Sequence, residues 1–366
     1  MYLFTNREAL LPALTKVIGA IGKTSMPILS NFLLNATHER LEITATDLEI
    51  ELKTGLQASV KDFGKVTVPA KKLLDIVKSF PPSTDIKMKL DTENARLIVT
   101  CGRSRFQLGV LSADEFPMMP EIENGFAFAL TDSQLKRIVD KTAFAMAKDD
   151  VRYYLNGVLF DMTHPHLAVV ATDGHRLALW QTDIAIAGAD HRIIFPHKAI
   201  MELKRQLTGS EDEVSFALSE KAAQMVIGDF TMTTKLVDGR YPEYERVVPD
   251  NLKCSAFLNR DELKTALNRT AILSNEKYKG VKITFAAGSL GLTANNSSQE
   301  SAEEEIGLDY TGDEVTIGFN VGYIADALNA MTSQTVQVQF QDANSSSIWR
   351  GSDCQNETFV VMPMRL

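Results

Sequence analysis

A pattern of mainly apolar residues occurs three times along this chain of 366 residues, each time at the same offsets. Residues at such offsets lie on one face of a helix and pack against a core. A self-similar period of about 125 residues constrains the fold more than any other feature, because each copy is expected to form the same unit. The three stripes are Leu10, Leu14, Val17, Ile18; Leu135, Val139, Thr142, Ala143; and Leu263, Leu267, Thr270, Ala271.

Two further features occur in the same order in each third of the chain. A strand-like run ends at Asp47, Asp173 and Asn295, and a second short helix is expected after Pro69, Pro196 and Asn320. Three matched features in order are unlike chance similarity between ordinary α+β segments. The sequence therefore predicts three modules. We predict their bounds as residues 1–124, 125–251 and 252–366.

Short alternating runs lie between the expected helices, as in residues 281–285 and 315–319. Such runs are typical of half-buried strands, and the brief turns between them favour antiparallel hairpins. We therefore expect the α+β class, each module an antiparallel sheet with two helices. Thr131 or Asp132 is expected to cap the first helix of the second module, and Asn259 that of the third.

Composition indicates an ordinary globular protein, with 45% apolar and 23% charged residues. The sequence lacks a run of about 20 apolar residues that would cross a bilayer, and its start does not resemble a secretory signal, so a cytoplasmic protein is expected. Cys101, Cys254 and Cys354 are widely separated and lack metal-binding spacing, which predicts free thiols, no metal site and no cofactor.

Charge is distributed unevenly, although the chain carries a net charge of −9. The six expected helices together carry +6, and the rest carries −15. A basic face on a single helix usually contacts only water. Taken alone, the helix with Arg137, Lys141 and Lys148 would be explained in this way. Four basic helices at equivalent repeat positions favour a surface that faces a polyanion.

The two ends of the chain carry complementary residues. Three like modules joined side by side form an arc, and a head-to-tail contact between two arcs closes a ring if the rotation allows. Ordinary surface charge explains the pattern equally well at this point. The candidate interface residues are Arg96, Arg103, Arg105, Phe106 and Leu108 near one end, and Ile272, Leu273, Glu300, Glu303 and Glu304 near the other.

An enzyme is the first alternative. Gly22-Lys23-Thr24-Ser25 is like the end of a phosphate-binding loop, but the required first glycine is replaced by Val17 and the segment follows a helix instead of preceding one. Asp173 and His175 have no repeat counterparts with a nucleophile or a metal cluster. We therefore expect a non-catalytic protein.

Several long strings resemble the bacterial β sliding clamps, the processivity subunits of DNA polymerase III. The similarity covers the full length and rests on residues 150–157, 171–178, 235–240, 271–277 and 360–366. It implies a head-to-tail homodimer whose six modules form a ring around double-stranded DNA. It also implies the replicative polymerase alpha subunit and the clamp loader as partners.

The resemblance implies two sets of site residues. The residues expected to face DNA are Lys23, Lys71, Lys72, Arg137, Lys141, Lys148, Arg152, Tyr153, Tyr154, Lys198, Lys204 and Arg205. The residues expected to line a groove for partner peptides are Leu155, Thr172, Gly174, His175, Arg176, Leu177, Pro242, Arg246, Val247, Tyr278, Asn320, Tyr323, Ser346, Val360, Val361, Met362, Pro363 and Met364.

The apolar and methionine residues of this set suit a surface that accepts several ligands. Without the resemblance, the C-terminal apolar tail reads more simply as an edge strand. A peptide-binding scaffold that does not encircle DNA is the second alternative.

Overall fold

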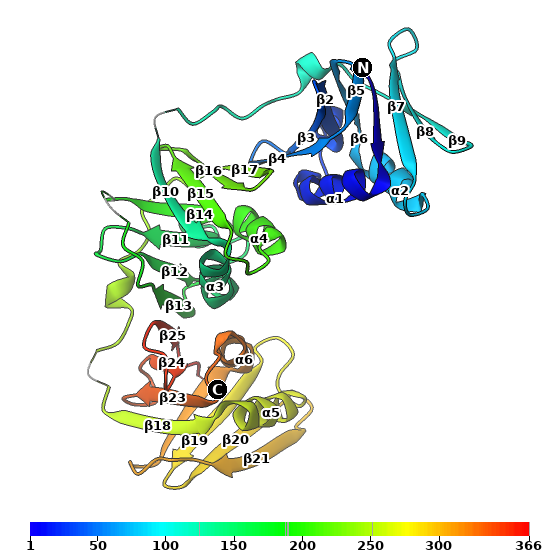
Figure 1. Ribbon diagram of the computed structural model, residues 1–366. Helices are drawn as coiled ribbons and strands as arrows, with labels where there is room; N and C mark the ends of the chain where they lie inside the picture. Colours follow the sequence, from blue (N-terminus) through cyan, green and yellow to red (C-terminus); the bar gives the residue numbers. More distant parts are fainter. Residues whose placement is uncertain (124, 187, 189, 251, 366) are drawn as a thin grey trace. The chain divides into compact units, whose positions relative to one another are not determined.

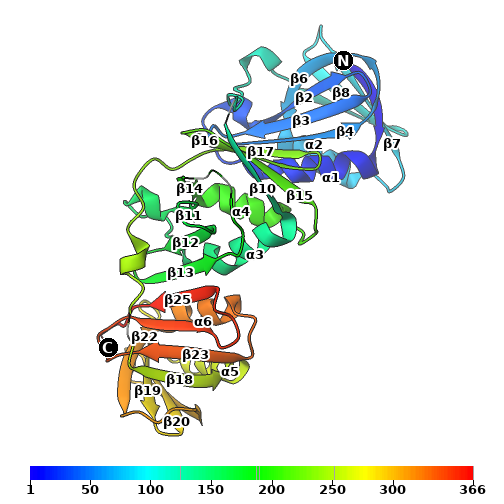
Figure 2. The same ribbon diagram turned by 60° about the vertical axis from the view of Figure 1, so that its left-hand side comes forward.

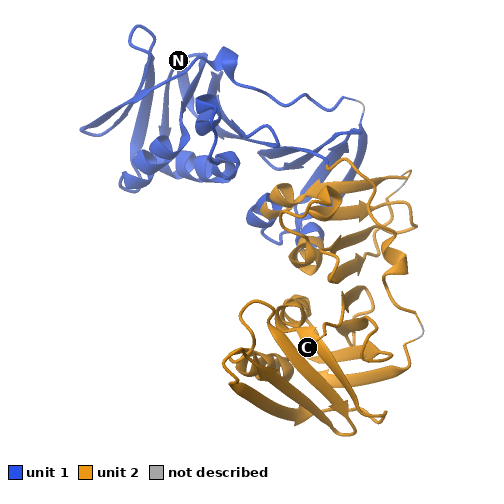
Figure 3. Ribbon diagram, turned by 180° about the vertical axis from the view of Figure 1, so that it is seen from behind, with its two compact units in different colours: residues 1–136, 202–236 blue, residues 137–201, 237–366 orange. Residues whose placement is uncertain are grey.

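The computed structural model describes residues 1–366 except 124, 187, 189, 251 and 366. The predicted module boundaries at 124 and 251 lie outside the described residues and stay a prediction. The chain divides into two compact units (Figure 3), one of residues 1–136 and 202–236 and the other of residues 137–201 and 237–366. The middle third therefore contributes to both units.

The helices and strands follow one another in the order expected from the repeat (Figure 1). The α-helices of the described residues are α1 (Arg7–Val17), α2 (Ala70–Ser79), α3 (Asp132–Thr142), α4 (His197–Gln206), α5 (Arg260–Ala271) and α6 (Val321–Ala330). Strands of the first third are β1 (Tyr2–Asn6), β2 (Asn31–Thr37), β3 (Arg40–Thr46), β4 (Ile50–Gln57), β5 (Ser59–Asp62), β6 (Gly64–Pro69), β7 (Asp85–Asp91), β8 (Arg96–Cys101) and β9 (Ser104–Gly109).

Strands of the second third are β10 (Phe126–Thr131), β11 (Gly157–Asp161), β12 (Ala168–Thr172), β13 (Arg176–Gln181), β14 (Arg192–Pro196), β15 (Glu213–Leu218), β16 (Ala222–Ile227) and β17 (Phe230–Lys235). Strands of the last third are β18 (Cys254–Asn259), β19 (Gly280–Ala286), β20 (Ser289–Asn295), β21 (Ser301–Gly307), β22 (Val315–Asn320), β23 (Thr335–Phe340), β24 (Ser347–Gly351) and β25 (Glu357–Val361).

The strands pair antiparallel throughout the described residues, which confirms the predicted α+β class. Their orders are β5-β1-β7-β8-β9, β10-β15-β16-β17-β4-β3-β2-β6, β14-β11-β12-β13-β25-β24-β23-β18 and β21-β20-β19-β22. Each third thus supplies strands to two sheets, and the expectation of one sheet per module was wrong. Neighbouring thirds share a sheet where β4 pairs with β17 and where β13 pairs with β25 (Figure 2).

The apolar stripes of α1, α3 and α5 form part of the core, as predicted. Leu10, Leu14 and Val17 are fully buried, and so are Leu263 and Leu267 at the same offsets in the last third. Burying an aliphatic side chain of this size contributes about 1.5–3 kcal/mol to stability. The repeat therefore places equivalent helices against equivalent sheets.

The helix starts agree with the predicted caps. The Asn259 side chain accepts hydrogen bonds from the amides of Asp261 and Glu262. Thr131 Oγ1 accepts from Gln134 N, and Gln134 Oε1 accepts from Thr131 N, so Thr131 forms a reciprocal capping box. Asp132 is the first residue of α3 and accepts instead from the amide of Gly209.

Candidate DNA interface and partner groove

Most of the cationic residues predicted to face DNA are exposed. In the first unit these are Lys23 in the loop after α1, Lys71 and Lys72 in the first turn of α2, and Lys204 and Arg205 in the last turn of α4. In the second unit Arg137, Lys148 and Arg152 are exposed and Lys198 is half-buried. Lys71 and Lys198 lie at the same offset near the starts of the equivalent helices α2 and α4, and Lys23 and Lys148 lie at the same offset after α1 and α3.

Lys141 is an exception, because the structure buries it. Its Nζ lies 2.5 Å from Glu357 Oε2, and both side chains are almost fully buried. The ammonium also lies over the Trp180 ring, 5.5 Å from its centroid. A lysine held in this way cannot reach a phosphate, so the assignment of Lys141 to the DNA-facing set was wrong. It joins α3 to β25 instead.

Arg205 is exposed but already engaged. Its Nη1 donates to Thr15 O at 2.8 Å and its Nη2 donates to Lys16 O at 2.6 Å, at the carboxyl end of α1. The same guanidinium pairs with the buried carboxylate of Glu202. Cations at a helix carboxyl end compensate the helix dipole. Arg205 therefore fastens α4 to α1, which the sequence pattern did not reveal.

The loop before β11 presents an arginine and two tyrosines. Asp150 holds Arg152 through two side-chain hydrogen bonds of 3.0 Å. These bonds lower the pKa of Asp150 to about 2. The Tyr153 side chain is 73% exposed, whereas Tyr154 packs against the apolar cluster of the neighbouring sheet face. Tyr153 is thus free to stack on a base, and Tyr154 is not fully available.

The predicted partner groove lies where β13 and β25 pair. Leu177 pairs with Val360, and both belong to one apolar cluster that also contains Tyr241 and Tyr244 of the segment after β17. Val247 packs on this cluster from the same segment. Leu155, Leu177 and Val360 are almost fully buried, so they form a floor under more exposed side chains.

Arg176 makes several contacts among the predicted groove residues. Its guanidinium donates to Asp173 at 3.1 Å and to Asp326 of α6 at 2.5 Å, and also donates to Phe144 O. It lies over the Tyr323 ring, 4.7 Å from the centroid. These contacts join the second and last thirds and hold His175 near Tyr323 in a stacked arrangement. Arg176 therefore positions the groove instead of offering a free charge.

The C-terminal tail continues beyond β25. Met362 N donates to His175 O at 3.0 Å and Met364 N donates to Gly318 O at 2.8 Å. A pocket of about 340 Å³ adjoins the tail, lined by Lys282, Thr316, Gly318, Ala343, Asn344, Pro363, Met364 and Arg365. Sequence reasoning identified Pro363 and Met364 but missed the β19 and β22 residues, which lie far away in the chain.

The structure places the remaining groove residues as follows. Side chains alternate along a strand, so Val361 points to the opposite face from Val360 and offers its carbonyl, which accepts from Ser347 Oγ. Tyr278 is 54% exposed and Arg246 is exposed. Thr172 is buried and accepts from Gly174 N. The half-buried members are Pro242, Asn320 and Ser346.

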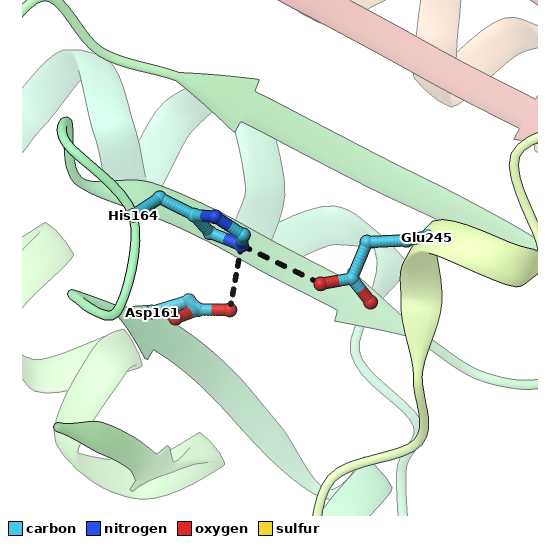
Figure 4. Close-up of side chains that lie close together, drawn as sticks. All are labelled: Asp161, His164 and Glu245. Carbon is cyan, nitrogen blue, oxygen red and sulfur yellow. Dashed lines mark ion pairs between the residues drawn. The ribbon is translucent and has the colours of Figure 1, made fainter. Parts of the chain in front are cut away.

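A group of three potential metal ligands lies near this face, although the sequence spacing gave no sign of it. His164 Nε2 lies 3.6 Å from Asp161 Oδ2 and 3.5 Å from Glu245 Oε1 (Figure 4). Arg192 Nη2 lies 2.8 Å and 2.9 Å from the same two oxygens. One guanidinium already pairs with both carboxylates, so we interpret the group as an ion-pair network that fixes Tyr244, whose hydroxyl donates to Asp161.

The candidate interface residues lie on or next to the edge strands β9 and β21 and after α5: Arg105 is on β9, Arg103 precedes it, Arg96 is on the neighbouring strand β8, Glu300 precedes β21, and Ile272 and Leu273 follow α5. Phe106 and Leu108 are on β9, and Glu303 and Glu304 are on β21. The Ile272 side chain is 76% exposed, whereas that of Leu108 is only 7% exposed. Leu108 therefore belongs mainly to the core of its own sheet. Glu304 pairs with Arg269 of α5 within the chain.

Comparisons with known proteins assign the chain to a family. Models of the N-terminal, central and C-terminal domains of the DNA polymerase III beta subunit match residues 1–120, 129–243 and 245–365. The chain belongs to the DNA polymerase III beta subunits, the bacterial beta sliding clamps. The chain is therefore a DNA sliding clamp that serves as a processivity factor. The alternative of a peptide-binding scaffold that does not encircle DNA is not favoured.

Individual clamps are similar over their whole length. The beta sliding clamp of Pseudomonas putida is 44% identical over 369 residues, and that of Escherichia coli is 41% identical over 363 residues; the alignments cover 100% and 99% of both chains. The crystal structure of the Pseudomonas aeruginosa subunit has a TM-score of 0.96 at 43% identity, with both chains fully covered. Another structure of that clamp is bound to griselimycin.

Proposed function

We propose that two copies of this clamp join head to tail into a ring of six modules around double-stranded DNA. The observation that carries the proposal is the repeated way in which neighbouring thirds join. At each junction within the chain, a strand of one third pairs antiparallel with the last strand of the next third, β4 with β17 and β13 with β25. In the repeat, β21 is the equivalent of β4 and β13, and β9 is the equivalent of β17 and β25. Neither has such a partner within the chain, and both are edge strands.

The alignment of the repeats gives a register for this third junction. The alternating buried residues Leu290, Leu292 and Ala294 match Leu41, Ile43 and Ala45. This places Asn295 in the position of Thr46 and Thr172, one residue away from the alignment suggested by Asp47 and Asp173. If β21 and β9 pair in the register that joins β4 to β17 and β13 to β25, Glu303 lies opposite Arg105 and Glu305 lies opposite Arg103. Opposite charges at directly opposed positions stabilise an antiparallel pair. An unpaired edge strand is also a ready template for pairing.

The helices support the same junction. Glu202 of α4 and Asp326 of α6 are repeat equivalents, and an arginine bridges each of them to carbonyls near the end of the first helix of the preceding third, α1 and α3 respectively. The third equivalent of these carboxylates is Asp75 of α2, which is exposed. The helix equivalent to α1 and α3 is α5, and its end lies beside the exposed Ile272. We infer that Asp75 faces this helix end in a second copy.

The DNA-facing residues of the ring are proposed to be the predicted set without the buried Lys141, namely Lys23, Lys71, Lys72, Arg137, Lys148, Arg152, Tyr153, Tyr154, Lys198, Lys204 and Arg205. Non-specific contacts of this kind give Kd values of only about 10⁻⁴–10⁻⁶ M and weaken with salt. A weakly basic wall therefore allows sliding, and the closed ring provides retention. The acidic remainder of the chain discourages DNA from binding outside the ring.

The groove around Leu177 and Val360 is proposed to hold peptides of the polymerase alpha subunit, the clamp loader and other replication proteins. Burying two or three anchor side chains, less the cost of ordering a peptide, corresponds to roughly micromolar binding. Exchange between partners would then be fast. The clamp is proposed to act without catalysis, in the cytoplasm. No helix among the described residues is long and apolar enough to cross a membrane.

A charge swap tests the ring junction. Arg105→Glu alone, or Glu303→Arg alone, should place like charges opposite one another and raise the dimer Kd by about tenfold or more. The double variant should restore the dimer, as measured by sedimentation velocity. Lys89→Glu on the interior strand β7 is the matched control and should leave the dimer intact. If the double variant stays as dissociated as the single variants, the register is wrong.

A further inference from the structure

Two pockets occupy equivalent positions of the repeat. One, of about 840 Å³ in the second unit, is lined in part by Ala168, Leu179, Ile348 and Thr358. The other, of about 540 Å³ in the first unit, is lined by the repeat equivalents Glu42, Lys53, Gln224 and Thr231. Both lie on the sheet face beside a shared junction strand pair. Their different linings reveal which one is suited to a ligand.

In the pocket of the first unit, the charged side chains form ion pairs with one another. Lys53 lies 3.4 Å from Glu42, and Arg40 lies 2.7 Å from Asp229. The buried Glu51 carboxylate accepts from Met119 N at 2.8 Å. The charged side chains that line this pocket are thus largely paired, and a ligand would have to displace partners to bind there.

The pocket of the second unit leaves a cation unneutralised. Arg350 on β24 donates from Nη2 to Gln339 Oε1 at 2.9 Å, but its Nε is buried without a hydrogen-bond partner. Among the described residues, no carboxylate pairs with this guanidinium. Burial lowers the pKa of Arg350, and no nearby charge opposes that effect. Arg350 is half-buried, and a partly desolvated cation without a counter-ion favours the arrival of an anion.

The other charged residues of the pocket do not serve Arg350. Glu245 is held by Arg192 at 2.9 Å and lies beside His164. Asp183 and Asp250 are exposed. The rest of the lining mixes apolar side chains such as Leu179 and Ile348 with polar ones, namely the amides Gln181, Gln355 and Asn356, the hydroxyls of Thr182, Thr358 and Tyr244, and the imidazoles of His164 and His166. Apolar side chains next to amides suit a polypeptide, whose backbone needs hydrogen-bond partners.

The pocket and the groove share one apolar cluster. Leu179 and Ile348 of the pocket belong to the same cluster as Leu177 and Val360 of the groove. Val247, a predicted groove residue, and Val248, which lines the pocket, are consecutive residues of the segment after β17, and both pack on this cluster. A polypeptide that leaves the groove across this segment would enter the pocket.

We propose that this pocket binds an acidic segment of a groove-bound protein partner, whose Asp or Glu carboxylate pairs with Arg350. The proposal rests on the proposed function of the groove. The pocket would be a second contact site for the same partner. It would favour partners with a negative charge at this position, whereas the groove favours partners with apolar side chains.

Fluorescence anisotropy with three labelled peptides tests the proposal on the full-length clamp. The first peptide is the groove-binding segment of the polymerase alpha subunit alone. The second carries short flanks of alternating Gly and Glu on both sides, and the third carries Gly and Gln flanks. We expect the Glu-flanked peptide to bind about tenfold more tightly than the Gln-flanked one, as one charge-assisted hydrogen bond warrants.

Arg350→Gln should abolish this tenfold preference, and Arg350→Glu should reverse it in favour of Lys-flanked peptides. Arg40→Gln in the equivalent pocket is the matched control and should keep the preference. An equal affinity for Glu and Gln flanks, or a preference that survives Arg350→Gln, overturns the proposal. Failure of the unflanked peptide to bind would instead contradict the groove itself. Competition by inorganic phosphate as strong as by the Glu flanks would indicate a site for free anions and overturn the peptide assignment.

Discussion

At the scale of single residues, charge alone does not tell which cations face DNA. Lys141 and Lys148 lie on the same predicted helix, yet Lys148 is exposed and Lys141 is buried against Glu357. The pattern of α3 predicts its apolar face correctly. It does not predict Lys141, because the partner carboxylate is supplied by a strand more than 200 residues away. Long-range pairing of this kind leaves no local signal.

Lys141→Met should destabilise the protein strongly. Removing one partner of a buried ion pair leaves an unpaired charge and typically costs about 3–5 kcal/mol. Lys141→Met combined with Glu357→Gln should recover much of this loss, because it removes both charges. Urea unfolding at a fixed protein concentration measures the difference. A Lys141→Met variant as stable as the parent would contradict the burial of this pair.

Asp150→Asn should strengthen DNA binding. Asp150 engages the Arg152 guanidinium, so its removal frees a cation for phosphate. Each phosphate neutralised adds roughly 0.9 to the slope of log K against log salt. Because the pKa of Asp150 is lowered to about 2, its carboxylate stays ionised above that pH, and the parent slope should not change between about pH 5 and 8. An unchanged slope in Asp150→Asn would place Arg152 away from DNA.

At the scale of elements, the repeat made the helices and their caps predictable, since local periodicity and capping residues determine both. The division of each third between two sheets was not predictable in this way. Strand pairing between thirds joins β4 to β17 and β13 to β25, and these strands carry no sequence mark of their distant partner. The same limit applies to the groove, where Lys282 and Gly318 were missed.

Deletion of residues 362–366 should abolish stimulation of the polymerase and leave the dimer intact. The tail contributes the Met362 and Met364 contacts to the groove, while the proposed ring junction lies on β9 and β21. Primer-extension assays measure the first effect, and sedimentation measures the second. Polymerase stimulation that persists after the deletion would place the partner site elsewhere.

Ile272→Ala combined with Leu273→Lys should open the ring. Ile272 exposes 76% of its side chain in the single chain, which suits an apolar contact with a second copy. A lysine beside it would have to be buried in that contact. Val151→Ala, at another highly exposed apolar residue, is the matched control. Sedimentation of both variants as dimers would exclude this surface.

At the scale of the whole molecule, one structural unit is adapted to three tasks. The junction beside β4 is filled by paired charges such as Lys53 and Glu42. The equivalent junction beside β13 carries apolar residues such as Leu179 and has room for a partner. The third set of junction strands, β9 and β21, lies at sheet edges, where the proposed second copy would pair. The sequence repeat predicts the common unit, and the replaced side chains give each copy its task.

A closed ring would stay on DNA by topology alone, and loading the clamp onto nicked circular DNA measures this retention. The clamp is loaded by the clamp loader, unbound protein is removed, and half of the sample is cut once with a restriction enzyme. Gel filtration then measures how much clamp stays with the DNA. A closed ring predicts that the clamp persists on the intact circle and slides off the linear form. Equal retention on both forms, or equal loss from both, would contradict it.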